Sequence, residues 1–309
     1  MQGVGAMRGL TQGPGLFARF LKRMQRSWHG YVFIAPAMTI ILIFAYIAMV
    51  FSLYVSFHRW DIINPDKPFV GFDHYLHAID NKTLWNAFKN TAYFTFVAVP
   101  IITVFSLCLA LWAHWAPRGR GFFRTVYFIP TITPMVVVAL IWLWIYSPNG
   151  PFSQILELLS ISPPNWLNSM GWAMPAVIFM TIWAAVGYFM IIFIAGREDI
   201  PPVYYDAAKV DGANSWQQFW NVTLPLMRNS VAFVWVILTI GSWQVFTQMF
   251  VLTRGGPNRA TESVQQVIYQ VAFENFRMGR AAAISWFLFA VIFIFTVFQL
   301  KLYRSRQLY

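Results

Sequence analysis

The sequence predicts an all-α membrane protein with six transmembrane helices. The 309-residue chain is 58% apolar and 11% charged, whereas a soluble domain is about 45–50% apolar and about 25% charged. Six apolar runs are each long enough to cross a hydrocarbon core about 30 Å thick. The basic residues divide unevenly among the segments between these runs, and this asymmetry gives the predicted helices an orientation.

The six predicted spans cover residues 31–57, 91–115, 126–146, 173–195, 230–252 and 281–302. Prolines lie within the spans or near their starts, at Pro36, Pro100, Pro130, Pro134 and Pro175. Neighbouring helices can satisfy the backbone groups that a proline frees inside a membrane. We therefore expect kinked helices in one bundle over residues 31–303, between a basic tail at 1–30 and a short tail at 304–309.

The charge asymmetry predicts that both termini are cytoplasmic. With the N-terminus inside, the inner segments carry fourteen of the 22 Lys and Arg together with four acids, and the outer segments carry eight with seven acids. Positive residues accumulate in cytoplasmic loops, so the loop over residues 196–228 also lies inside. The net charge of +11 then reflects this topology and contact with anionic lipid rather than nucleic acid.

Several functional classes lack their residues in this sequence. The spans contain no Asp, Glu, Lys or Arg away from their ends, although ion-coupled transporters need such groups. There is no glycine-rich phosphate-binding motif, so any ATP and Mg²⁺ must bind a separate chain. His74 and His77 alone are too few for a metal site. We expect no catalytic residue, no metal and no cofactor in this chain.

A polar segment over residues 204–225 separates two long apolar runs. Asp211-Gly212 is a turn signal, because glycine adopts a positive φ without cost. Asn214 or Ser215 can cap a second short helix, which Pro225 ends before the next span begins. A polar segment of this length in a membrane protein must meet water or a soluble partner.

This segment resembles the EAA loop of ABC importer permeases. Asp206-Ala207-Ala208 is followed by three residues and Gly212, and nine residues later by the sequence VTLP, which ends at Pro225. Asp replaces the usual Glu at position 206, and Val replaces the usual Ile at position 222. The resemblance implies a type I importer permease fold and a coupling helix that inserts into a groove of the ATPase. The implied coupling residues are Tyr205, Asp206, Ala207, Ala208, Asp211, Gly212, Ala213 and Pro225.

Further motifs are similar to those of the carbohydrate-uptake branch of this family. They are FVGFDHY at 69–75, LWNAFKNT at 84–91 and TRGGP at 253–257. The resemblance implies import of a sugar or oligosaccharide across a bacterial cytoplasmic membrane, by alternating access. It also implies a second permease, usually a different chain, two ATP-binding subunits and an outer solute-binding protein. Apolar spacing over residues 263–276 indicates an amphipathic helix, which either helps receive that binding protein or lies on the membrane surface.

A sugar pathway needs hydrogen-bonding side chains and aromatic platforms in the bundle. Gln244 and Gln248 lie four residues apart and are expected to share one helix face. By resemblance to maltose-type permeases, the predicted pathway residues are Tyr188, Ser242, Trp243, Gln244 and Gln248. Alternatively, these side chains only pack and bond between helices.

Two other functions compete with the importer. The first is an ATP-independent channel or facilitator whose 204–225 segment is a regulatory dock, and the second is a structural subunit of an assembly or export complex. The outer-loop motifs count against both. The substrate is not encoded in any motif, and an acidic oligosaccharide such as an alginate fragment would need cations that the spans of this chain do not offer.

Overall fold

The computed structural model describes residues 28–115 and 120–304, and every regular element in these stretches is helical. The chain divides into two units, of which the first ends at Tyr54 and the second begins at Val55. The predicted tails over residues 1–27 and 305–309 lie outside the described residues.

The first unit contains one long helix. Its elements are α2 (Trp28–Ile41), the π-helical stretch η1 (Leu42–Ile47) and α3 (Ala48–Ser56), which together form a 29-residue candidate span. Almost every described side chain up to Tyr54 is exposed within the chain. An apolar helix without a covered face is suited to lipid or to other helices.

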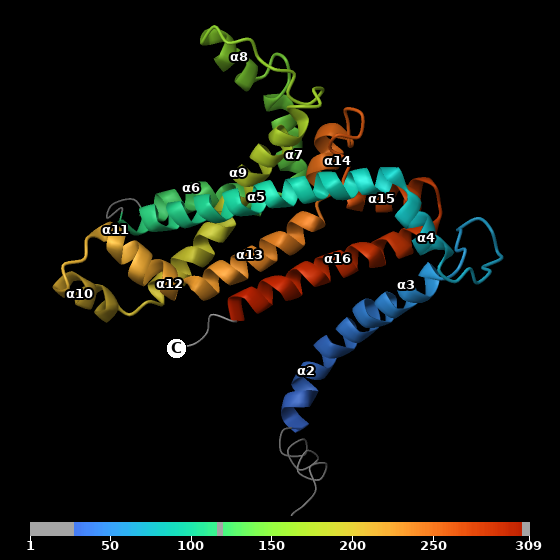
Figure 1. Ribbon diagram of the computed structural model, residues 1–309, viewed down its shortest axis with the longest axis horizontal. Coiled ribbons are helices and arrows are strands. Elements are labelled where there is room, and N and C mark those ends of the chain that lie inside the picture. The colour runs from blue at the N-terminus through green and yellow to red at the C-terminus, as the bar shows by residue number, and fades with distance from the viewer. Residues whose placement is uncertain (1–27, 116–119, 305–309) are drawn as a thin grey trace, which may run out of the picture. The chain divides into compact units, whose positions relative to one another are not determined.

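The second unit contains the remaining helices (Figure 1). They are α4 (Asp73–Asp80), α5 (Lys82–Trp115), α6 (Arg120–Ile132), α7 (Met135–Ile145), α8 (Pro151–Leu158), α9 (Ala173–Glu198), α10 (Pro202–Val210), α11 (Ser215–Gln218), η2 (Phe219–Thr223), α12 (Leu224–Leu226), α13 (Arg228–Trp243), α14 (Thr247–Thr253), α15 (Val264–Tyr269), η3 (Gln270–Glu274) and α16 (Met278–Arg304). Within this unit, α10–α12 lie at one end and α4 and α15 at the other.

The described residues hold four to six candidate spans. Single helices provide the span of the first unit and the spans of α5, α9 and α16. The other two candidates are bent pairs, in which α6 meets α7 at 106° and the 215–226 helices meet α13 at 65°. The predicted all-helical membrane class is confirmed, and six spans result if each bent pair crosses the membrane once.

The predicted third span is not one straight helix. α6 ends at Ile132 and α7 begins at Met135, with Pro134 at its N-cap. Proline disfavours helical backbone at the residue before it, so Thr133 leaves the helix and the chain turns. Pro100, in contrast, is accommodated inside the continuous helix α5.

The predicted fifth span is also interrupted. α13 ends at Trp243 and α14 begins at Thr247, so residues 244–246 are not helical. The break contains neither proline nor glycine, and composition alone therefore predicted a continuous helix.

Two clusters of buried side chains hold the second unit together. The larger lies among α5, α7, α9, α13 and α14, and the smaller lies among α4, α5, α13, α15 and α16. The helix predicted over residues 263–276 is present as α15 and η3. Its Val264 and Val267 are buried in the smaller cluster, so this helix packs inside the unit rather than lying freely on the membrane surface.

Candidate functional site

The polar 204–225 segment folds as two short helices around a glycine turn. α10 begins with Pro202 at its first position and has Asp211 as its C-cap. Gly212 follows with φ +74°. Its N–H bonds to the carbonyl of Lys209 at 3.0 Å, and the N–H of Ala213 bonds to that of Ala208 at 2.8 Å. This pair of bonds is the Schellman ending of a helix, which favours glycine at the left-handed position.

A capping box begins the second helix. The side-chain oxygen of Asn214 accepts from the N–H of Gln217 at 2.9 Å, and the side-chain oxygen of Gln217 accepts from the N–H of Asn214 at 2.8 Å. Each side chain thus satisfies one backbone donor of the first turn, and Asn214 is the N-cap. The helical path continues through η2 and α12 to Leu226, so Pro225 lies inside it and does not end it.

Tyr205 anchors this segment to the bundle. Its ring lies 4.0 Å from the guanidinium carbon of Arg197 at the end of α9. Its hydroxyl and the hydroxyl of the buried Thr223 in η2 share a hydrogen bond of 3.0 Å. One side chain thereby connects α9, α10 and η2, and it fixes α10 relative to the helix that leads into α13.

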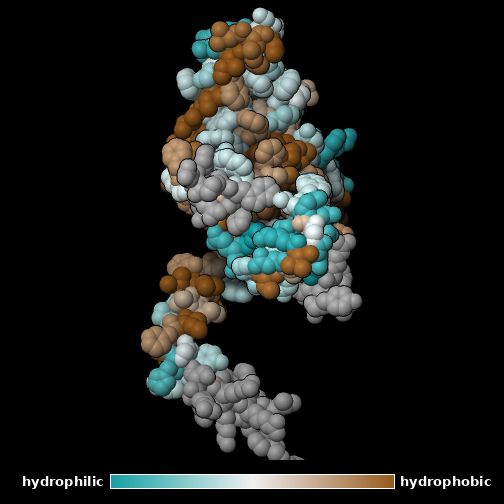
Figure 2. Space-filling view, turned by 90° about the vertical axis from the view of Figure 1, so that its left-hand side faces the viewer, coloured by the Kyte–Doolittle hydropathy of each residue, from teal (hydrophilic) through white to brown (hydrophobic). Residues whose placement is uncertain are grey.

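The opposite face of the segment is open. Within this chain, a Cβ placed on Gly212 would meet no atom within 4 Å. Asp206 pairs with Lys209 at 3.1 Å, and both side chains are more than 60% exposed. Among these polar groups, the large apolar side chains Val203, Tyr204, Val210, Trp216 and Trp220 are exposed. Seen from this end, the second unit carries hydrophilic surface with hydrophobic residues at its edge (Figure 2). Exposed apolar groups within a polar surface are typical of a docking site for another protein.

The eight predicted coupling residues therefore share one segment. Asp206, Ala207, Asp211, Gly212 and Pro225 are exposed, whereas Tyr205, Ala208 and Ala213 are half-buried.

The predicted pathway residues of the fifth span are separated by the helix break. Gln244 is the C-cap of α13, whereas Gln248 belongs to α14. The expectation that these two residues share one helix face is therefore wrong. Gln244 is exposed, and Gln248 is half-buried. From Arg228, the 16 residues of α13 rise about 24 Å at 1.5 Å per residue.

The other pathway residues lie in different surroundings. Trp243 is buried, with ring contacts to Phe88 and Phe295 at 6.3 and 5.5 Å between centroids. Tyr188 on α9 is 50% exposed and packs edge-on against Phe189. Ser242 is buried. Packing in the core explains the position of Trp243, whereas the side chains of Tyr188 and Gln244 are exposed and can offer their polar atoms to a ligand.

A polar contact between α13 and α16 was not predicted from the sequence. The side-chain amide of Gln299 on α16 donates to the hydroxyl of Thr239 on α13 at 2.9 Å. The amide oxygen of Gln299 has no partner and is buried. A glutamine inside an apolar run is a visible signal, because interhelical hydrogen bonds satisfy such groups in membranes.

Comparison with known proteins establishes the family. Residues 102–307 match the family described as "Binding-protein-dependent transport system inner membrane component". The chain belongs to this family. The resemblance seen in the 204–225 segment is thereby confirmed, and the protein is a non-catalytic membrane permease subunit of the ABC importer class.

Relatives extend the match over nearly the whole permease. The trehalose/maltose transport system permease protein MalF of Thermococcus litoralis is 33% identical, over 90% of this chain and 94% of that protein. AmyD of Thermoanaerobacterium thermosulfurigenes, a probable starch degradation products transport system permease protein, is 31% identical over 94% of this chain and 98% of that protein.

A solved structure establishes the fold. A bacterial ABC transporter involved in the import of the acidic polysaccharide alginate contains a chain that superposes with a TM-score of 0.82. It is 25% identical and covers 94% of this permease and 99% of that chain. The permease therefore has the type I ABC importer fold.

Proposed function

We propose that this permease is a membrane-spanning subunit of an ATP-driven, binding-protein-dependent importer of a sugar or oligosaccharide. The observation that carries the proposal is the 202–226 segment, which presents the open face of Gly212 and exposed apolar side chains at one end of the second unit. Family membership and the sugar permeases among its relatives support the solute class. An ATP-independent facilitator is not supported.

The proposed topology has six spans in the cytoplasmic (inner) membrane of a bacterium. The α6–α7 pair crosses once, and α13 crosses while the 215–226 helices before it stay in the cytoplasm. The domain covers residues 31–303, and the tails at 1–30 and 304–309 are cytoplasmic. The basic residues favour this orientation. The 196–228 loop then faces the cytoplasm, where an ATPase can reach it.

The proposed partners follow from this arrangement. Two ATP-binding subunits supply ATP and Mg²⁺ chemistry, a second and different permease completes the pathway, and an outer binding protein delivers the solute. When ATP closes the ATPase dimer, its motion enters the permease through α10, and the Tyr205 contacts carry it to α9 and η2. The cavity between the two permeases then opens alternately to the outside and the inside.

In the proposed pathway, Tyr188, Gln244 and Gln248 contact the solute. The buried Ser242 and Trp243, which directly precede the helix break, hold it in place by packing. Exposed backbone at a helix break is tolerated at membrane depth where it lines a water-filled cavity. A neutral sugar can bond to such groups and stack on a tyrosine ring. An acidic oligosaccharide such as an alginate fragment, the solute class of the structural relative, would need its cations from the partner permease.

Replacing Gln244 with Leu tests this pathway. We expect the maximal uptake rate in proteoliposomes to fall about three- to tenfold, because one hydrogen bond is worth about 0.5–1.5 kcal/mol. The matched control is Gln154→Leu on α8, an exposed glutamine that bonds only to the carbonyl of Asn149. Equal rates for both variants would place the solute elsewhere.

Purification of the intact complex from native membrane tests the importer itself. Mass spectrometry should find a phosphate-loop ATPase and a second permease with this chain, and uptake should require ATP. Recovery of this chain alone, together with ATP-independent uptake into liposomes, would contradict the proposal.

A further inference from the structure

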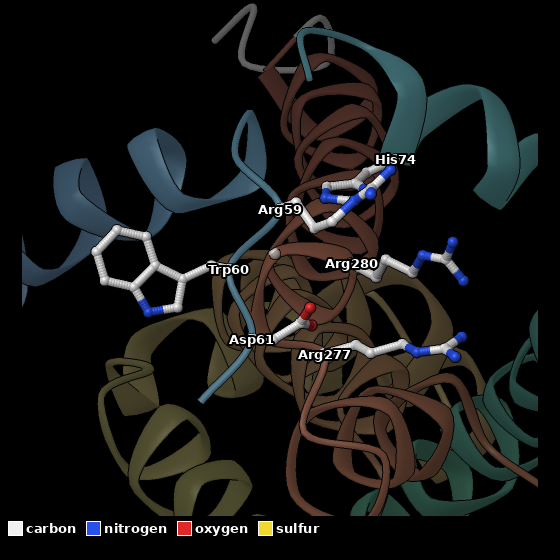
Figure 3. A pocket seen from close by; sticks show the side chains of 7 residues that line it. Arg59, Trp60, Asp61, His74, Arg277 and Arg280 are labelled. Atoms are coloured by element: carbon white, nitrogen blue, oxygen red, sulfur yellow. The ribbon is translucent and has the colours of Figure 1, made fainter. Parts of the chain in front are cut away.

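A basic cavity lies at the end of the second unit opposite α10–α12. Its volume is about 330 Å³, and it is lined by Arg59, Trp60, Asp61, His74, Arg277, Gly279 and Arg280 (Figure 3). A second cavity of about 210 Å³ shares His74, Arg277 and Arg280 and adds His77, Asn81 and Asn275 to the polar lining. Neither cavity belongs to the proposed coupling segment or solute pathway.

Backbone contacts build this cavity from three distant segments. The N–H of Gly279 donates to the carbonyl of Trp60 at 3.1 Å, and the backbones of Asp61 and Arg277 pair in an isolated antiparallel β-bridge. A Cβ on Gly279 would lie 2.2 Å from the carbonyl oxygen of His58. Glycine therefore allows the start of α16 to approach the 58–61 segment and bring its arginines to the cavity.

The positive charge of the cavity is not balanced. Three guanidinium groups line it with one carboxylate, that of Asp61. Among the residues that the structure describes, none of the three arginines forms an ion pair. Figure 3 shows the side chains of Arg277 and Arg280 extending in the same direction, and Arg280 approaches the ring of His77 at 3.5 Å. Two guanidiniums that extend the same way suit an oxyanion with several oxygens.

His74 gives an independent sign of an unfilled contact. Its side chain is only 4% exposed, and its Nε2 donates to the carbonyl of His58 at 3.1 Å. Its Nδ1 is buried without a partner. Burial lowers the pKa of His74, as do the nearby charges of Arg280 and Arg59, whereas the hydrogen bond to His58 and the charge of Asp73 act in the opposite direction. An anion in the cavity would offset the repulsion between a protonated His74 and the two arginines.

The lining is unlike that of a sugar site. The ring of Trp60 points away from the arginines in Figure 3 and lies 5.5 Å from the ammonium group of Lys67. The cavity therefore offers charged donors without an aromatic platform, and ionic recognition is the chemistry that it supports.

Depth in the membrane indicates which anion is nearby. Arg280 lies in the first turn of α16, whose residues Met278–Tyr303 form a candidate span. Basic residues at the end of a span lie at the level of the lipid headgroups. On α4, which carries His74, Leu76 and Ile79 expose more than half of their surface, as does Phe72 just before it, and these apolar side chains can contact acyl chains.

We propose that this cavity binds the phosphate group of an anionic phospholipid, with Arg59, Arg277 and Arg280 as its cations. An anionic lipid is preferred over a zwitterionic one because no second carboxylate in the lining would attract a choline or ethanolamine group. This lipid site goes beyond the proposed transport function, and it depends only on the end of α16 lying at the membrane surface.

Lipid retention by the intact complex tests the site. The complex is equilibrated in mixed micelles of phosphatidylglycerol and phosphatidylcholine, washed in detergent and weighed by native mass spectrometry. The double variant Arg277→Gln/Arg280→Gln should retain phosphatidylglycerol at least about tenfold less well than the wild type, since two charge-assisted contacts are lost. Arg254→Gln, at an exposed arginine outside both cavities, should retain it normally.

Each other outcome contradicts the proposal. Equal retention by the double variant would exclude the site, and failure of the wild-type complex to retain phosphatidylglycerol while it binds inorganic phosphate would assign the cavity to a free anion. Loss of binding-protein association with unchanged lipid retention would assign the cavity to protein docking. If the double variant does not fold, two other variants replace it: Arg280→Gln, and the charge-retaining Arg277→Lys/Arg280→Lys. The lipid site then requires that Arg280→Gln retain phosphatidylglycerol less well than the double lysine variant does.

Discussion

Replacing Gly212 with Asp is expected to leave the permease folded in the membrane but to uncouple ATP hydrolysis from transport. Asp tolerates the left-handed conformation better than most residues, and the added Cβ meets no atom of this chain. Its carboxylate would instead fill the open face of the α10 turn, where the ATPase docks in the proposed complex. Binding-protein-stimulated ATP hydrolysis should fall at least about tenfold, which corresponds to about 1.4 kcal/mol of lost interaction.

The control for this experiment uses the same substitution elsewhere. Gly121 in α6 is exposed and also has open space around its Cβ position, so Gly121→Asp should leave stimulated ATP hydrolysis near the wild-type level. Membrane content of both variants is measured by immunoblot. Normal stimulation in Gly212→Asp would show that this turn does not dock closely against an ATPase.

Replacing Gly187 with Ala is expected to destabilise the bundle strongly. A Cβ at this position would lie 1.8 Å from the carbonyl oxygen of Tyr127 and 2.6 Å from its carbonyl carbon. These are backbone atoms of α6, so relief requires α6 and α9 to separate. Overpacking of this kind costs about 1–3 kcal/mol or more, and the melting temperature of the purified complex should fall by roughly 5 °C or more.

Thermal unfolding of a second glycine variant separates this clash from a general effect of alanine. Gly241 lies in α13, and a Cβ on it would meet nothing within 4 Å. Gly241→Ala should therefore keep or slightly raise the melting temperature, because alanine favours a helix over glycine by about 0.5–1 kcal/mol. Equal melting temperatures for Gly187→Ala and the wild type would refute the close contact between α6 and α9.

Local chemistry explains what could be predicted from the sequence. The Asp211-Gly212 turn and the Asn214 cap depend on neighbouring residues only, and both are present. The length of the apolar runs predicted the membrane class because it is also a local feature: each spanning helix satisfies its own backbone hydrogen bonds.

Features that depend on several segments were not predictable. Nothing in the composition of the fifth span signals the break at 244–246, which lies where α14 leaves the direction of α13 to pack among α7 and α9. The pairing of Gln244 with Gln248 on one face failed because it assumed a continuous helix. The basic cavity joins residues about 200 positions apart. In the sequence, each of its charged residues looks like an ordinary loop residue, and nothing indicates that they meet.

The break after Trp243 also bears on how the permease is made. Non-helical backbone is not stable against hydrocarbon, and Gln244 at this break is exposed within this chain. Val245 is buried within this chain, so in a newly inserted copy it is Gln244 that we expect to need water or another subunit beside it. We therefore expect an unpaired copy to be less stable in the bilayer than one assembled with its partner permease.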